Sequence, residues 1–234
     1  MRNRDFASKQ LKLIQKRIEL AARKANRSTS EISLIGASKQ QKSQMIEVFH
    51  NSGLINFGEN YLNEALNKRS ELSKNDICWH FIGRLQSNKC KLVAHNFDWV
   101  HTIDRLKVAQ SLSRLDPDKN LNVLIQINID NESSKGGTSL PDLPRLSDEI
   151  AQLKNLQLRG FMLIPKASNH LEDQQRPFAI AKETLDNINQ TYGLSMDTLS
   201  MGMSNDLEAA ILEGSTMIRV GTALFGPRIN PLQA

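Results

Sequence analysis

Short apolar runs alternate with longer segments of helical periodicity from about residue 33 to the end of the chain. Continuous apolar runs of this kind are typical of strands that are buried on both faces of a sheet. The candidate strands are residues 32–37, 54–58, 79–83, 98–102, 121–129, 157–164, 196–201 and 216–222. Strands that alternate with helices in this way predict a parallel sheet in an α/β protein.

Helical patterns fill the intervals between these strands, and one more precedes them. The candidate helices are about 6–25, 43–53, 60–72, 87–96, 105–115, 143–153, 176–193 and 205–214. Eight strands with seven intervening helices and an additional N-terminal helix predict a single (β/α)8 TIM-type barrel. No helical pattern follows the eighth strand before the ending GPRINPLQA, so we expect the N-terminal helix to cover that part of the barrel wall.

An open doubly wound sheet would show the same alternation of strands and helices. A sequence motif distinguishes it from the barrel. An open sheet of that type normally carries a nucleotide fingerprint after its first strand. Neither GxGxxG nor GxxxxGK[ST] occurs in the sequence. No Pro-rich or Gly/Ser-rich linker divides the chain, and residues 133–144 are typical of one long loop between a strand and a helix. We therefore expect residues 1–234 to form a single domain.

The composition excludes several classes of protein. Hydrophobic residues make up 39% and charged residues 24% of the 234 residues, unlike collagen-like, coiled-coil or largely disordered chains. No apolar run approaches the roughly 18 residues that span a bilayer, and no apolar segment follows the N-terminus MRNRDFASKQ. We expect a cytoplasmic protein without a membrane partner. Cys78 and Cys90 fit neither a disulfide framework nor a zinc motif, so we expect reduced thiols and no metal site.

The net charge of +5 raises the question of a nucleic-acid partner. The excess charge is modest and spread along the chain, and it is densest in the predicted first helix. Basic residues recur there opposite an apolar stripe. The basic residues are Lys9, Lys12, Lys16, Arg23 and Arg27, and the stripe is Leu11, Ile14, Ile18 and Ala22. A solvated face above a buried stripe explains this pattern, so we expect no nucleic-acid partner. The alternative is an adaptor that binds a polyanion or protein through this face, with an affinity that falls steeply with salt.

The ligand site of a TIM-type barrel lies at the C-terminal ends of its strands. Lys39 stands just beyond the first predicted strand. Its amine could be desolvated in the barrel mouth, which lowers the pKa of a lysine and allows it to form Schiff bases. The alternative is a surface lysine in an ordinary turn.

The last two strands carry a pattern that suits a phosphate. MGMS (201–204) leads into a helix, and VGT (220–222) ends the eighth strand. Glycine at Gly221 lets backbone N–H groups approach an anion, and the hydroxyls of Ser204 and Thr222 can donate to it. The alternative is helix capping by Ser204 or Asn205 and a tight turn at Gly221.

Arg219 interrupts the apolar eighth strand. A guanidinium in such a strand points inward only when an electron-rich partner needs it there. An anion or a ring nitrogen would satisfy it, and so would an ion pair with a carboxylate such as Glu213.

Several segments, each at a predicted strand end and in matching order, resemble the YggS/PROSC family of pyridoxal phosphate (PLP) homeostasis proteins, also called PLP-binding proteins. The matching segments are ASK (37–39), GENYLNEA (58–65), WHFIGRLQSNK (79–89), VHTID (100–104), VLIQINIDNESSKGG (123–137) and LSMGMSNDLEAAILEGSTMIRVGTALFGPR (199–228). The resemblance covers nearly the whole chain and implies a modified (β/α)8 barrel. One departure is Gln40, where the family commonly has threonine, and it concerns local hydroxyl contacts only.

The resemblance also implies a cofactor and its ligands. Lys39 would hold PLP as an internal aldimine. Ser204 and the backbone of Gly221 and Thr222 would hold its phosphate. Arg219 would face the pyridine nitrogen, and Asn60 would lie near the ring.

An arginine facing the ring nitrogen disfavours its protonation, and an unprotonated pyridine is a poor electron sink. We therefore expect a PLP-binding protein in PLP homeostasis that is not an enzyme and that serves PLP-dependent apoenzymes, as a monomer or a weak homodimer. The alternative is a racemase-like enzyme, because the barrel and the arginine resemble the N-terminal domain of alanine racemases. Those enzymes need a tyrosine from a C-terminal β-domain, which we do not expect here. His80, Tyr61 and His101 are the candidate second bases, although core or rim packing explains both histidines.

Overall fold

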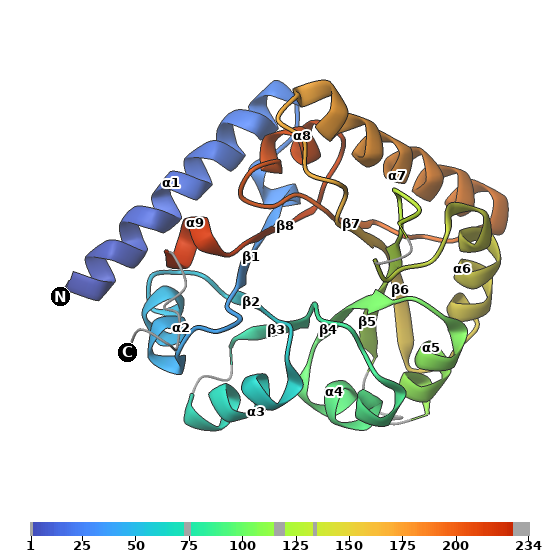
Figure 1. Ribbon diagram of the computed structural model, residues 1–234, viewed down its shortest axis with the longest axis horizontal. Coiled ribbons are helices and arrows are strands. Elements are labelled where there is room, and N and C mark those ends of the chain that lie inside the picture. The colour runs from blue at the N-terminus through green and yellow to red at the C-terminus, as the bar shows by residue number, and fades with distance from the viewer. Residues whose placement is uncertain (1, 73–75, 115–119, 133–134, 227–234) are drawn as a thin grey trace.

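The computed structural model describes residues 2–72, 76–114, 120–132 and 135–226. Eight parallel strands form a closed barrel in which each strand pairs with its neighbours in sequence and β8 pairs with β1 (Figure 1). The strands are β1 Ser33–Ala37, β2 Asn56–Glu59, β3 Cys78–Phe81, β4 Trp99–Ile103, β5 Leu121–Ile127, β6 Leu156–Leu163, β7 Thr198–Ser200 and β8 Met217–Val220. The predicted barrel and all eight strands are confirmed, and no strand end differs from its expected place by more than two residues.

Helices surround the barrel, as Figure 1 shows. The α-helices are α1 Arg2–Lys24, α2 Ser43–His50, α3 Leu62–Glu71, α4 Cys90–Asn96, α5 Leu106–Ser113, α6 Leu143–Ala151, α7 Leu171–Tyr192, α8 Leu207–Leu212 and α9 Thr222–Phe225. The 3-10 turns are η1 Thr29–Glu31, η2 Ser87–Lys89 and η3 Leu140–Asp142. All the predicted helices are confirmed. Helix α7 begins five residues earlier than the expected start at Arg176, because Glu172 and Asp173 complete a first turn whose charge suits the helix N-terminus.

The prediction that no helix follows the eighth strand is wrong. Helix α9 begins directly after β8, but its four residues are too few to show helical periodicity in a sequence. Residues 227–234, which include most of the ending GPRINPLQA, lie outside the described residues. Helix α1 covers this side of the wall as expected, since it packs against α8, α9 and α2 (Figure 1).

Helix α1 buries one apolar stripe and exposes most of its basic residues. Leu11, Ile14, Ile18 and Ala22 are buried, whereas Lys9, Lys12, Lys16 and Arg23 are exposed. Arg27 departs from the expected solvated face. It is partly buried and donates hydrogen bonds to the carbonyl oxygens of Ile211 and Ser215, at 3.2 and 2.8 Å. Arg27 therefore ties the end of α1 to the loop between α8 and β8.

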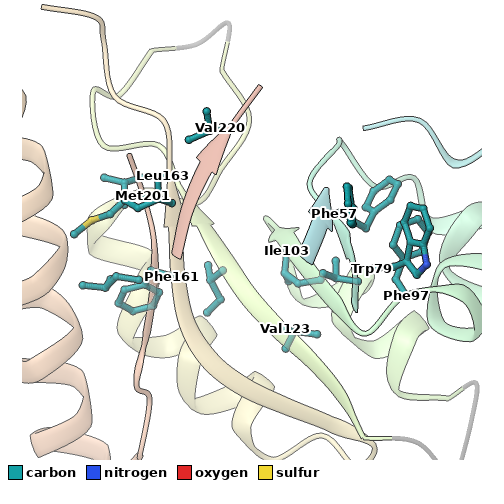
Figure 2. Packing of buried hydrophobic residues seen from close by; sticks show 14 of the residues in the cluster. Phe57, Trp79, Phe97, Ile103, Val123, Phe161, Leu163, Met201 and Val220 are labelled. Carbon is teal, nitrogen blue, oxygen red and sulfur yellow. The ribbon is translucent and has the colours of Figure 1, made fainter. Parts of the chain in front are cut away.

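Apolar side chains between the barrel and its helices form the main core. Figure 2 shows Phe57, Trp79 and Phe97 gathered beside β2 and β3. The rings of Phe57 and Trp79 lie 6.3 Å apart and both residues are buried. Since strands of a parallel barrel bury both faces, such residues alternate with others that point to the interior.

The segment expected as one long loop begins at residue 133, and residues 133 and 134 lie outside the described residues. From residue 135 onward, the loop is anchored, because Thr138 pairs with Ile127 and its hydroxyl donates to the carbonyl oxygen of Asp104 at 2.9 Å. In the part of the chain that the structure describes, no helix has the length and apolar character needed to cross a membrane.

Phe49 of α2 joins the helices that cover the β8–β1 side of the barrel. It is fully buried, and its ring packs edge-on against Phe225 of α9, 4.7 Å away, and against Phe6 of α1, 6.4 Å away. We expect Phe49→Ala to lower the free energy of unfolding by about 3–5 kcal/mol, because it removes a buried ring and leaves a cavity. Urea denaturation measures this change. The control Leu13→Ala, at a position of α1 that is 52% exposed, should change the stability by no more than about 0.5 kcal/mol.

Candidate functional site

The residues singled out in the sequence all lie at the C-terminal ends of strands, which together form the mouth of the barrel. Lys39 follows β1, Asn60 follows β2, Ser204 follows β7, and Gly221 and Thr222 follow β8. Strands β7, β8, β1 and β2 are consecutive around the barrel. A Cβ placed on Gly221 would lie 3.5 Å from the carbonyl oxygen of Ala37, so the ends of β8 and β1 are close. The fold thus brings these residues to one side of the mouth.

The turn that carries Lys39 is braced from both sides by α3. The ammonium group of Lys68 donates to the carbonyl oxygen of Ser38 at 2.7 Å, and a carboxylate oxygen of Glu64 accepts the backbone N–H of Gln40. Gln40 adopts a left-handed backbone conformation with φ of 62°. Lys39 itself is partly buried. Because the peptide groups before and after it are both held, the backbone at Lys39 has little freedom.

Lys68 is also one partner of a buried ion pair. Its ammonium lies 2.7 Å from Oε1 of Glu59 and 2.6 Å from Oε1 of Glu64, and the Ser38 hydroxyl donates to Glu59 at 2.6 Å. Burial raises the pKa of Glu59, while the nearby charge of Lys68 opposes that rise. Sequence reasoning missed Lys68, since a lysine in an amphipathic helix pattern gives no sign that it is buried.

Asn60 is placed by close packing against Gly83. A Cβ on Gly83 would lie only 1.9 Å from the carbonyl oxygen of Asn60, so no larger residue fits there. Oδ1 of the Asn60 side chain is buried and has no hydrogen-bond partner among the described residues, and the same is true of Oε2 of Glu59. Buried polar atoms without partners carry a free-energy cost that a bound polar molecule can offset.

The turns after β7 and β8 offer unpaired donors. Within the described residues, the Ser204 hydroxyl has no hydrogen-bond partner, and neither the Gly221 nor the Thr222 backbone N–H donates to another residue. The alternative of α8 capping by Ser204 or Asn205 is not found, because Asp206 is the N-cap residue and its carboxylate accepts the N–H of Met203 in the preceding turn at 2.5 Å. Amides and hydroxyls directed from two adjacent turns suit an anion.

Arg17 of α1 fixes the turn that contains Ser204. It binds both carboxylate oxygens of Glu208, at 2.7 and 2.8 Å, and donates to the carbonyl oxygen of Ser204 at 2.9 Å. A two-pronged contact of this kind holds geometry better than a single point charge. Arg17 was not among the residues expected at the site, because only the tertiary fold brings α1 beside α8.

Arg219 points into the barrel, where it is almost fully buried. Its guanidinium donates to Oγ of Ser200 at the end of β7, at 2.7 Å, and to the carbonyl oxygen of Leu163 at the end of β6, at 3.0 Å. The ion pair with Glu213 that the sequence left open is not formed, since Glu213 accepts a hydrogen bond from Gln175 instead. Burial lowers the pKa of Arg219 to about 10, so the group keeps its charge at neutral pH.

The three residues considered as second bases differ in position. His80 and His101 are buried and hydrogen-bonded to each other at 3.0 Å, whereas Tyr61 is 57% exposed. Burial lowers the pKa of His80 to about 3 and that of His101 well below its ordinary value. Both imidazoles are therefore neutral structural groups. No cluster of three or more metal-ligating side chains occurs within the described ranges.

We expect Lys68→Met to lower the free energy of unfolding by about 3–5 kcal/mol at neutral pH, because it leaves the Glu59 carboxylate buried without a counter-ion. Loss of the Lys68 charge raises the pKa of Glu59 further. A carboxyl whose pKa is higher in the folded state favours folding at low pH and loses this contribution as pH rises through the folded pKa. The deficit of the variant should therefore shrink as pH falls.

Urea titrations across a pH series measure this trend. The double variant Glu59→Gln/Lys68→Met, which buries no charge at position 59, should regain part of the stability at neutral pH. A Lys68→Met deficit that is the same at every pH would contradict the interpretation.

Comparison with known proteins shows which family this chain resembles. Residues 10–229 match the family model for the N-terminal domain of alanine racemase. A pyridoxal phosphate homeostasis protein of Pseudomonas aeruginosa is 48% identical over 91% of each chain, and one of Escherichia coli is 45% identical over 92% of this chain and 94% of its own.

Among solved structures, PipY of Synechococcus elongatus with PLP bound is 33% identical and superposes with a TM-score of 0.79, over 91% of this chain and all of its own. Identity at this level over nearly full lengths, together with the shared barrel, settles the family. The chain belongs to the pyridoxal phosphate homeostasis proteins, a family built on the barrel of the alanine racemase N-terminal domain.

Proposed function

We propose that this protein binds PLP as an aldimine of Lys39 and takes part in intracellular PLP homeostasis. Its curated relatives carry that name, and PipY holds PLP on the same fold. The observation that carries the proposal is the buried, charged guanidinium of Arg219. Among the described residues Asp206 attracts it, but no carboxylate lies within ion-pair distance, and a buried cation needs a direct electron-rich partner. The lone pair of a pyridine nitrogen is such a partner.

The mouth supplies groups of matching chemistry for the rest of the cofactor. The Lys39 amine would attack the aldehyde carbon of PLP, form a C=N bond and release water. Unpaired donors at Ser204, Gly221 and Thr222 suit the phosphate, and Asn60 would lie near the ring. The braced turn fixes the backbone that carries the Lys39 side chain, which lowers the entropy lost on binding.

We propose further that the protein holds and releases PLP without catalytic turnover. An arginine beside the ring nitrogen disfavours protonation of the ring, and an unprotonated ring stabilises carbanions poorly. The neutral, buried His80 and His101 are occupied by hydrogen bonds, which supports the same view over the racemase-like alternative. In this proposal residues 1–234 act as one PLP-binding domain in the cytoplasm, with PLP-dependent apoenzymes as recipients. The choice between a monomer and a weak homodimer stays open.

Lys39→Ala should abolish covalent binding of PLP. The wild-type protein incubated with PLP should show the visible absorption of a protonated Schiff base, and borohydride should fix the cofactor to the peptide that contains Lys39. The matched control is Lys42→Ala, an exposed lysine three residues further along the chain, which should retain both signals. Borohydride-fixed cofactor in Lys39→Ala at the wild-type level would refute the assigned role.

The same preparations decide the question of turnover. We expect no conversion of L-alanine or other amino acids by the PLP-loaded wild-type protein above the rate of free PLP. Turnover that disappears in Lys39→Ala would instead establish the racemase-like alternative.

Arg17→Met should weaken PLP binding several-fold, by about 1 kcal/mol, because the turn of Ser204 loses its anchor to α1. The covalent link to Lys39 should persist. Equilibrium titration of the Schiff-base absorption measures the change. Lys16→Met is the control, since Lys16 lies next to Arg17 but, among the described residues, pairs with the exposed Glu19 alone. Equal affinity in the two variants would show that Arg17 does not support the site.

A further inference from the structure

A continuous chain of hydrogen bonds runs behind Arg219 through the barrel. Arg219 donates to Oγ of Ser200 at 2.7 Å, and that oxygen lies 2.9 Å from Nδ1 of His101. Nε2 of His101 lies 3.0 Å from Nδ1 of His80. Nε2 of His80 in turn lies 3.1 Å from Oδ1 of Asn56 and 3.4 Å from Sγ of Cys78.

This chain crosses the interior of the barrel. Its members stand on β8, β7, β4, β3 and β2. Strands β7 and β4 are not neighbours in the barrel, so the contact between Ser200 and His101 passes through the interior and not along the wall. Ser200, His101, His80 and Arg219 are each at most 4% exposed. Where TIM-type barrels usually pack branched apolar side chains, this barrel contains a polar chain.

The donors and acceptors in the chain can be assigned from its two ends. A guanidinium only donates, so Ser200 accepts from Arg219 and its own proton is available to Nδ1 of His101. A neutral His101 that accepts at Nδ1 carries its proton on Nε2 and donates to Nδ1 of His80. His80 then carries its proton on Nε2 and donates to Oδ1 of Asn56, which only accepts.

The opposite direction of the hydrogen bonds is less favourable at the Asn56 end. If His80 carried its proton on Nδ1, its Nε2 would be an acceptor facing the acceptor Oδ1 of Asn56. Doubly protonated imidazoles are also disfavoured, because both rings are buried and His101 lies close to the positive charge of Arg219. His80 is held further by stacking on Trp99, with ring centroids 5.8 Å apart and planes within 15° of parallel. The first arrangement of protons therefore satisfies every member, whereas in the opposite one Oδ1 of Asn56 loses its donor and Nε2 of His80 accepts from the weak S–H donor of Cys78.

We propose that Ser200, His101 and His80 are positioning residues that lock Arg219 in the orientation in which its guanidinium meets the ring nitrogen of PLP. The part of this proposal that concerns the ring rests on the proposed function. The oriented hydrogen-bond chain directs a lone pair of Ser200 toward Arg219, so that the guanidinium is held between Ser200 and the carbonyl oxygen of Leu163. Because both histidines are neutral, Arg219 carries the only positive charge in this series of hydrogen-bonded groups, and it stands at the end nearest the mouth.

The protein without cofactor provides the first test. In the wild-type chain labelled with 15N-histidine, long-range proton–nitrogen NMR correlations should show His80 and His101 neutral, each with its proton on Nε2, down to about pH 5. A proton on Nδ1 of either ring, or titration of either ring near its ordinary pKa, would overturn the proposed chain. This measurement needs neither a variant nor PLP.

The second test uses Ser200→Ala beside the matched control Ser215→Ala. Ser215 is an equally buried serine whose hydroxyl, in the part of the chain that the structure describes, bonds to backbone carbonyl oxygens alone. In Ser200→Ala the His101 resonances should change to a mixture of tautomers, because Nδ1 loses its donor. Ser215→Ala should keep the wild-type tautomers even if it lowers stability.

PLP labelled with 15N in its ring reports the effect on the cofactor. We expect the ring-nitrogen signal of Ser200→Ala to move toward that of the protonated ring and its PLP affinity to fall about tenfold, with both unchanged in Ser215→Ala. The same ring signal in wild type and Ser200→Ala would refute the positioning role. Failure of the wild-type protein to bind PLP would refute the proposed function instead. The histidine tautomers would still decide whether the hydrogen-bond chain behind Arg219 is present.

Discussion

The guanidinium of Arg219 is buried inside a barrel, and the rest of the interior is arranged around its donors. A buried cation loses the hydration that stabilises it in water, so its surroundings must supply hydrogen bonds and an electron-rich partner. The protein supplies the carbonyl oxygen of Leu163 and the hydroxyl of Ser200, and behind Ser200 two histidines complete the set. Asp206 attracts this charge, but no carboxylate among the described residues lies within ion-pair distance of it, so the pyridine nitrogen of PLP can be its direct partner in the proposed function.

The mouth of the barrel is organised by residues that do not themselves reach a cofactor. Lys68 and Glu64 of α3 hold the peptide groups on either side of Lys39, and Arg17 of α1 holds the carbonyl oxygen of Ser204. Helices α3 and α1 thus fix two turns, after β1 and after β7, that lie on either side of the end of β8. Positional precision of this kind comes from the supporting contacts, because the turns alone would sample many conformations.

The sequence predicted the barrel because apolar runs typical of strands alternate without interruption with segments of helical periodicity. Runs rich in Val, Ile and Leu are typical of strands in any parallel sheet. The prediction missed α9, whose single turn shows no periodicity, and it placed the start of α7 at Arg176, beside Pro177, and not at Leu171. For the site, position at strand ends singled out Lys39, Ser204, Gly221 and Thr222, a charge inside an apolar strand singled out Arg219, and the family resemblance assigned Asn60. None of these signals indicated Arg17 or Lys68, because a basic residue on a helix has the same local pattern whether it is solvated or buried.

Local pattern by itself determined the class of the fold, the end of the barrel where ligands bind, and the residues of the chain that resemble the family's motifs. Only the tertiary structure decided which polar groups meet. It left Glu213 away from Arg219, placed His101 of β4 against Ser200 of β7, and turned Arg27 from an expected solvent-facing residue into a link to the α8–β8 loop. The reason is physical: apolar periodicity is a short-range property of a chain, whereas the pairing of buried polar groups depends on distances across the closed barrel that no local stretch of sequence contains.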